Sequence, residues 1–78
     1  MEPIEVTARF DLQGQITPLR FIWKGHSYLV ESTGRCWSAP DGRHMLVMAS
    51  SGQPFEILFT PGESRWYLEQ AGPIRTAA

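Results

Sequence analysis

The sequence predicts an all-β fold: a single small domain, built as an antiparallel meander of about six short strands and curled into a small barrel or half-barrel. Glycine, proline and serine interrupt the chain about every eight to twelve residues, a spacing typical of small sandwiches and barrels. No stretch of the chain combines a helical period with freedom from helix breakers. The 78 residues suffice for one domain, and curling its sheet leaves few strand edges open.

The first two strands are predicted at residues 3–10 and 16–24. PIEVTARF, the earlier one, alternates apolar and polar side chains, which is the pattern of a half-buried strand. In ITPLRFIWK, the later one, Leu19, Phe21 and Trp23 share one face. Pro18 cannot donate a ladder hydrogen bond, so it belongs at the start of this strand or on a sheet edge.

Gly25 predicts a tight turn into a third strand at residues 27–32. If Gly25 and His26 form a two-residue loop, the turn sets the pairs Trp23–Tyr28, Phe21–Val30 and Arg20–Glu31. These pairs place aromatic side chains on one face and opposite charges on the other, an arrangement that stabilises a hairpin. A three-residue loop would shift this register by one residue.

The second half of the chain predicts three more strands, at residues 44–50, 54–60 and 64–70. Before them lies the least regular part, which ends in a turn where Pro40 is preset and Gly42 can take a positive φ. HMLVMAS, the fourth strand, is apolar almost throughout and is expected to be covered on both faces. In the last hairpin we expect the pairs Trp66–Ile57 and Leu68–Phe55.

Composition limits the environment of this domain. The net charge is −1, so no bulk field draws the chain to nucleic acid or to a membrane. A single cysteine excludes an intrachain disulfide and favours a reducing, cytoplasmic location. No apolar run reaches the roughly 20 residues of a membrane helix, and the start MEPIEV lacks the features of a signal peptide. We expect a cytoplasmic domain over residues 1–70, followed by a flexible C-terminal tail, residues 71–78.

The sequence predicts no metal site and no cofactor. His26, Cys36 and His44 are the soft or borderline ligands, but their spacings of ten and then eight residues match no zinc pattern. Asp41 would complete a set of four only through a coincidence of the fold. Both histidines lie beside a glycine turn, so we expect them at the surface.

We also expect no enzyme activity. A nucleophile such as Cys36 or Ser27 needs a histidine base within reach and a third group to orient it, and the sequence has no nucleophile elbow or phosphate loop. Glu56 and Glu69 could be imagined as paired carboxylates, but solvated strand residues are the simpler interpretation.

The middle of the chain carries the one local bias in charge. Between residues 20 and 44 bases outnumber acids, whereas acids exceed bases outside that window. We therefore expect a basic surface that contacts phosphates or an acidic partner, formed by Arg20, Lys24, His26, Arg35 and Arg43. Exposed rings nearby would favour single-stranded nucleic acid, but we expect a domain this small to use its rings for its own core.

A protein partner is the competing expectation. A free edge strand can accept an extended peptide. Some apolar residues also lie on the reverse faces of their strands, namely Ile22 with Leu29 and Val47 with Met45 or Met48. They cannot all be buried on one side of a single sheet, so either the barrel is strongly coiled or this surface meets a partner or a second copy of the chain.

Two motifs, Phe-x-Trp-x-Gly-x-x-Tyr-x-Val and a closing Trp-x-Leu, lie within residues 18–68. The first motif covers Phe21, Trp23, Gly25, Tyr28 and Val30, and the second covers residues 66–68. Between them lie a tryptophan, Trp37, and an aromatic strand at residues 55–58. This pattern resembles a family of small uncharacterised bacterial domains without assigned catalytic residues. Some members are linked with proteins of DNA repair and translesion synthesis. The resemblance implies an accessory role, and we expect a non-enzymatic interaction module or, alternatively, a homodimerisation module.

Overall fold

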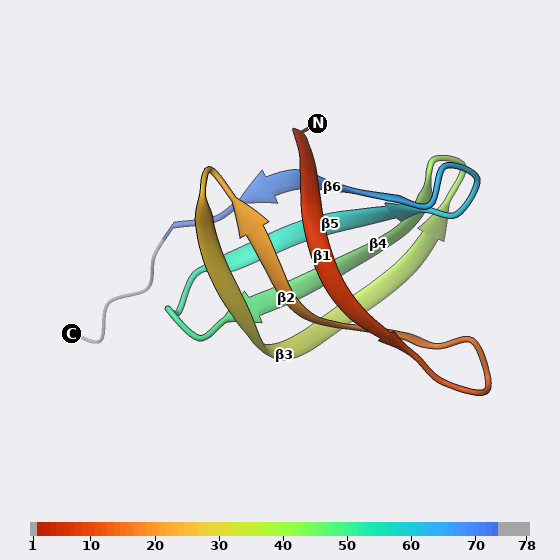
Figure 1. Cartoon of the computed structure of the whole chain (residues 1–78), viewed down its shortest axis with the longest axis horizontal. Helices are drawn as coiled ribbons and strands as arrows, with labels where there is room; N and C mark the ends of the chain where they lie inside the picture. Colours follow the sequence, from red (N-terminus) through yellow and green to blue (C-terminus); the bar gives the residue numbers. More distant parts are fainter. Residues whose placement is uncertain (1, 74–78) are drawn as a thin grey trace.

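The computed structural model describes residues 2–73, which contain six strands and no helix. The strands are β1 (Glu2–Phe10), β2 (Ile16–Trp23), β3 (His26–Ala39), β4 (Gly42–Ala49), β5 (Pro54–Thr60) and β6 (Arg65–Ala71). Each pairs antiparallel with the next, and β1 also pairs with β6, so the sheet closes into a barrel (Figure 1). This confirms the predicted fold class. Of the predicted tail, Ala71 ends β6 and residues 74–78 lie outside the described part.

The barrel closes because β1 and β3 each pair with different neighbours along their length. β3 is 14 residues long; residues 26–29 pair with β2 and residues 30–39 with β4, and the pairing with β4 contains two register shifts, after Val30 and after Thr33. The part predicted to be least regular is therefore the second half of β3. Such irregularities bend a strand and increase its twist. As a result β1 and β2 cross steeply over β4 and β5 (Figure 1).

The register of two hairpins differs from the prediction by two residues. The β2–β3 loop consists of Lys24 and Gly25, whose φ angles of 52° and 75° are those of a type I′ turn. Because the loop lies one residue earlier than predicted, the pairs are Trp23–His26, Phe21–Tyr28 and Arg20–Leu29, and Arg20 does not face Glu31. In the β5–β6 hairpin the pairs are Phe59–Trp66 and Ile57–Leu68. A shift of two keeps the side chains of these pairs on their predicted faces. The placement of Leu19 on the face of Phe21 is wrong: the register with β1 shifts at this point, Pro18 is buried, and Leu19 is 47% exposed.

The interior of the barrel is aromatic at its centre. Phe55 lies at ring-centroid distances of 4.9 Å from Phe21, 5.1 Å from Tyr28 and 5.7 Å from Trp23. The other buried core residues are Met45, Val47, Ala49, Ile57, Trp66 and Leu68. The rings of the β2–β3 hairpin therefore pack the core, as expected.

The fourth strand is not covered on both faces, contrary to the prediction. Met45, Val47 and Ala49 face the core, but Leu46 between them remains 40% exposed. Within residues 2–73 there is no helix that could cross a membrane.

Candidate functional site

A row of side chains crosses the outer face of the barrel. The strand register aligns Trp37 on β3 with His44 on β4, His44 with Leu58 on β5, and Leu58 with Tyr67 on β6. Met45, the neighbour of His44, belongs to the core, so alternation puts the row on the outside. Leu58 and His44 are nevertheless buried, because the side chains around them cover the middle of this face.

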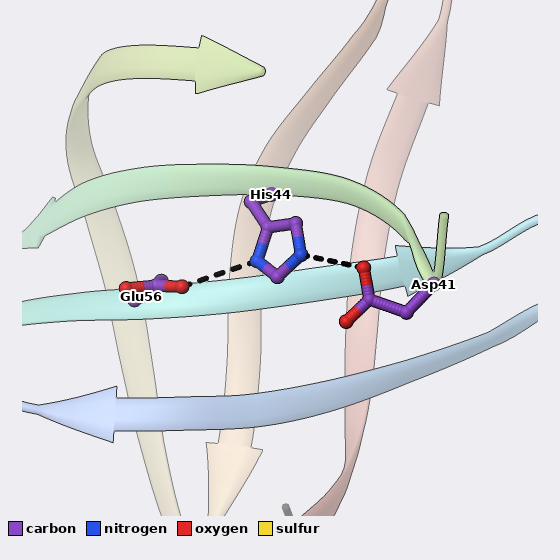
Figure 2. Close-up of polar contacts among 3 residues, drawn as sticks. All are labelled: Asp41, His44 and Glu56. Atoms are coloured by element: carbon purple, nitrogen blue, oxygen red, sulfur yellow. Dashed lines mark hydrogen bonds and ion pairs between the residues drawn. The ribbon is translucent and has the colours of Figure 1, made fainter. Parts of the chain in front are cut away.

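His44 lies between two carboxylates (Figure 2). Its Nε2 is 2.8 Å from Oδ1 of Asp41, and its Nδ1 is 3.1 Å from Oε2 of Glu56. Asp41 comes from the β3–β4 turn, where Gly42 takes the predicted positive φ, 140°. Glu56 lies on the adjacent strand β5, where it pairs with Leu46 of β4. Its carboxylate therefore reaches the imidazole ring from the side opposite to Asp41. The imidazole is thus fixed at both nitrogens, and its side chain is only 10% exposed.

This geometry favours the charged form of the histidine. A carboxylate can only accept, so both ring nitrogens donate when both carboxylates are ionised, which requires the imidazolium. Burial opposes that charge, but the hydrogen bonds from His44 to Asp41 and Glu56, with their negative charges, outweigh burial and raise the pKa of His44 above its ordinary value. The expectation of a surface histidine at this position is wrong.

Trp37 extends the site toward β3. Its ring lies parallel to that of His44, at a centroid distance of 5.2 Å and an interplanar angle of 7°. The guanidinium of Arg35 lies 5.1 Å from the centre of the Trp37 ring. The indole therefore lies against two cationic groups, a contact that adds to their stabilisation.

A third carboxylate reaches the same place from β6. Asp41, His44 and Glu69 each offer a ligand atom within 4.8 Å of the other two. The register of β5 with β6 shifts beside Glu56, which pairs with Gln70, while Ile57 pairs with Leu68, so Glu69 is the extra residue of a β-bulge. We call Asp41, His44, Glu56 and Glu69 the His44 cluster.

The five basic residues predicted as one surface lie in separate places. Arg20, Lys24 and His26 belong to the β2–β3 hairpin, on or near its turn. Lys24 lies 4.8 Å above the ring of Trp23. Arg35 lies on the second half of β3 beside Trp37, and Arg43 lies at the start of β4, opposite Phe59. The structure thus places three of the five in one hairpin, with Arg20 on its outer face beside Leu29 and His26 at the turn, opposite Trp23.

Of the candidates for catalysis and metal binding, the structure brings Asp41, His44, Glu56 and Glu69 together, but it leaves Cys36, His26 and Ser27 away from them. Cys36 is exposed and pairs with Met45, whereas His44 pairs with the next residue along β3, so Cys36 and His44 lie on opposite faces of the sheet. His26 lies at the β2–β3 turn. Among residues 2–73, neither Cys36 nor Ser27 makes a side-chain hydrogen bond to a histidine.

Searches with protein-family models, among curated proteins and among solved structures found no match to this chain. The resemblance to a bacterial domain family therefore stays a prediction.

Sequence reasoning named all four members of the His44 cluster, Asp41 and His44 as possible metal ligands and Glu56 and Glu69 as possible paired carboxylates, but it did not join the two pairs. His44 follows the turn Pro40-Asp41-Gly42 by two residues, and the side chain of an aspartate at a turn can contact a side chain three residues further along the chain. Glu69 carries no comparable signal, because its position depends on a bulge and on two strand registers.

Proposed function

We propose that the protein is a non-enzymatic interaction module that binds an acidic protein partner through the outer face of the β2–β3 hairpin. The observation that carries this proposal is the exposed apolar pair on that face. Ile22 is 40% exposed and Leu29 is 58% exposed. They are diagonal neighbours, because Leu29 pairs with Arg20 and Ile22 with Ser27.

Charged residues border this apolar pair, and one of them is acidic: Glu5 of β1 pairs with Ile22. Arg20 lies directly beside Leu29 on the same face, and Lys24 and His26 lie at the turn just beyond Ile22. An apolar centre with a charged rim is the usual composition of a protein interface. The excess of Arg20 and Lys24 over Glu31 in this hairpin favours an acidic partner.

The same hairpin supports nucleic acid less well. Binding of a single strand combines basic residues with rings on which bases stack. Here Phe21 is fully buried, and Trp23 and Tyr28 are packed against the core. An edge-strand mode is also disfavoured within the described residues, since β1 and β6 pair with each other at the closure. A role as an accessory to DNA repair would rest on a protein contact in this proposal.

The test is an NMR titration with an acidic peptide probe of alternating glutamate and leucine, at low and then moderate salt. We expect amide shifts confined to the β2–β3 hairpin, weakening as salt rises. Arg20→Glu should weaken binding at least several-fold, whereas Arg43→Glu makes the same charge change away from the hairpin and should not.

A single-stranded DNA oligonucleotide is the parallel probe. If it shifts the hairpin amides with a steep salt dependence and the peptide does not, the partner is a nucleic acid and the proposed protein partner is wrong. Peptide shifts that map elsewhere, or equal losses for Arg20→Glu and Arg43→Glu, would also refute the proposed surface.

A further inference from the structure

We propose that Asp41, His44 and Glu69 form a binding site for a divalent first-row transition-metal ion, with Zn²⁺ as the probe. This site lies on the outer face of β4–β6 and does not rest on the function proposed for the β2–β3 hairpin. Imidazole nitrogen and carboxylate oxygen are both zinc ligands in proteins, and three protein ligands leave a position open for water or another ligand.

The distances require only small side-chain movements. Zinc binds nitrogen and oxygen ligands at about 2.0–2.2 Å, so ligand atoms around it are about 3.3 Å apart in tetrahedral geometry. The three candidate atoms are now within 4.8 Å of one another. Asp41 is exposed and Glu69 is half-buried, so both carboxylates can move, while His44 stays fixed by its surroundings.

Glu56 holds His44 in the orientation that such a site needs. A histidine that binds a metal through one nitrogen usually donates its other N–H to a carboxylate, which fixes the ring and its tautomer. The Nδ1–Glu56 contact of 3.1 Å supplies that second partner. Nε2 then faces Asp41, and a metal ion would take the place of the proton that Nε2 now shares with this carboxylate.

Among residues 2–73, the cationic groups of the protein do not balance the negative charge of the His44 cluster. Three carboxylates meet a single imidazole, so the cluster is negative in either form of His44, and in the described part of the chain the ion pairs of this cluster are those of His44 alone. Glu69 approaches Asp41 without an ion pair or side-chain hydrogen bond of its own within that described part. Arg35 lies beyond Trp37, over the ring rather than beside a carboxylate. A divalent cation would balance this charge.

The surface also gives access. Asp41 lines a shallow depression between the β3–β4 and β5–β6 turns, together with Gly42, Glu63 and Tyr67. In Figure 1 these two turns lie together at one end of the barrel. An ion can therefore reach Asp41 from solvent without opening the core.

The test is isothermal titration of the whole chain with Zn²⁺. We expect one ion per chain with a dissociation constant in the micromolar range or below. Glu69→Gln, which keeps the size of the side chain, should weaken binding at least tenfold, and Glu56→Gln should weaken it about 10–100-fold through loss of the histidine's second partner. Glu31→Gln, at an exposed position of β3, and His26→Gln are matched controls outside the cluster and should bind as the native chain does.

Paramagnetic Co²⁺ gives an independent readout. Because Trp37 stacks on His44, its indole NMR signal should broaden before those of Trp23 and Trp66. The proposal is wrong if Zn²⁺ does not bind at millimolar concentration, if Glu69→Gln binds as tightly as the native chain, or if only His26→Gln weakens binding. A urea-unfolding curve for each variant separates loss of the site from loss of the fold.

Discussion

Gly42 is the residue whose replacement should disturb the barrel and the His44 cluster together. Its φ of 140° is a conformation that residues with a Cβ rarely adopt. A Cβ at this position would overlap the carbonyl oxygen of Phe59 and lie 3.1 Å from Cδ1 of Leu58. The carbonyl belongs to the backbone of β5, so it cannot rotate away as a side chain could. Gly42→Ala must therefore move β4 away from β5 or change the turn that positions Asp41.

The cost has two parts. Holding alanine in this backbone conformation costs about 2–3 kcal/mol. Separating β4 from β5 near the Arg43–Phe59 pair weakens one or two ladder hydrogen bonds, at about 1 kcal/mol each. The sum, about 3–5 kcal/mol, is a large share of the roughly 4–12 kcal/mol expected for a domain of this length. Gly14→Ala is the matched control: φ is also positive, 79°, but no atom lies within 4 Å of the added Cβ, so it should cost only about 1–2 kcal/mol.

Urea unfolding followed by tryptophan fluorescence measures both variants. The free energy of unfolding of a small protein falls by about 1 kcal/mol per molar urea. Gly42→Ala should therefore lower the urea midpoint by about 3 M or more, or leave the chain unfolded without urea. Gly14→Ala should lower it by about 1–2 M. If both variants lose the same stability, the overlap with Phe59 carries no energy and the reasoning from the close approach is wrong.

Two further predictions concern His44 and Ser64. Because the pKa of His44 is raised in the folded state, its stabilising contribution is complete below about pH 6.5, the ordinary histidine value, and is lost as pH rises through the raised folded value. With a chelator present, the free energy of unfolding should fall as pH rises from about 6.5 through the folded pKa of His44, and His44→Gln should remove the share of this fall that His44 causes. If the variant has the same pH profile as the native chain, the imidazolium bonded to two carboxylates is wrong. Ser64 is exposed and has a φ of 54°, so Ser64→Gly should stabilise the chain by about 0.5–1 kcal/mol, seen as a higher melting temperature. A lower one would show that the hydroxyl contributes more than the backbone relief.

The fold was predictable because its signals are local. The alternation in residues 3–10, the glycine turn after Trp23 and the apolar fourth strand each specify a strand or a hairpin within a few residues. Face assignments followed the same alternation, which is why Phe21 and Phe55 were correctly placed in the core. Registers were less predictable, since moving a loop by one residue changes every pair in the hairpin but moves no side chain to the other face.

The candidate site was not predictable in the same way. Asp41 and His44 are close in sequence, but Glu56 joins them through the pairing of β4 with β5 and Glu69 through the bulge in β6. Such contacts depend on the exact register, which is the least certain part of any prediction from sequence. The basic residues failed to form one surface for the same reason: β3 turns from one side of the barrel to the other between His26 and Arg35.

The closure of the barrel has a consequence for how the molecule folds and opens. Every strand contact except one joins neighbours in the chain, so five hairpins can zip up locally with little loop-closure entropy. Within residues 2–73 the β1–β6 seam is the one strand pairing that joins distant parts of the chain, and the described part of it holds three residue pairs, at Glu2, Pro3 and Ile4. It should therefore form last and open first. Opening the seam exposes the backbone of β6 beside Trp66. Strand β1 of a second molecule could then pair with β6 in place of the molecule's own β1, so the seam is where two copies of this fold would exchange strands.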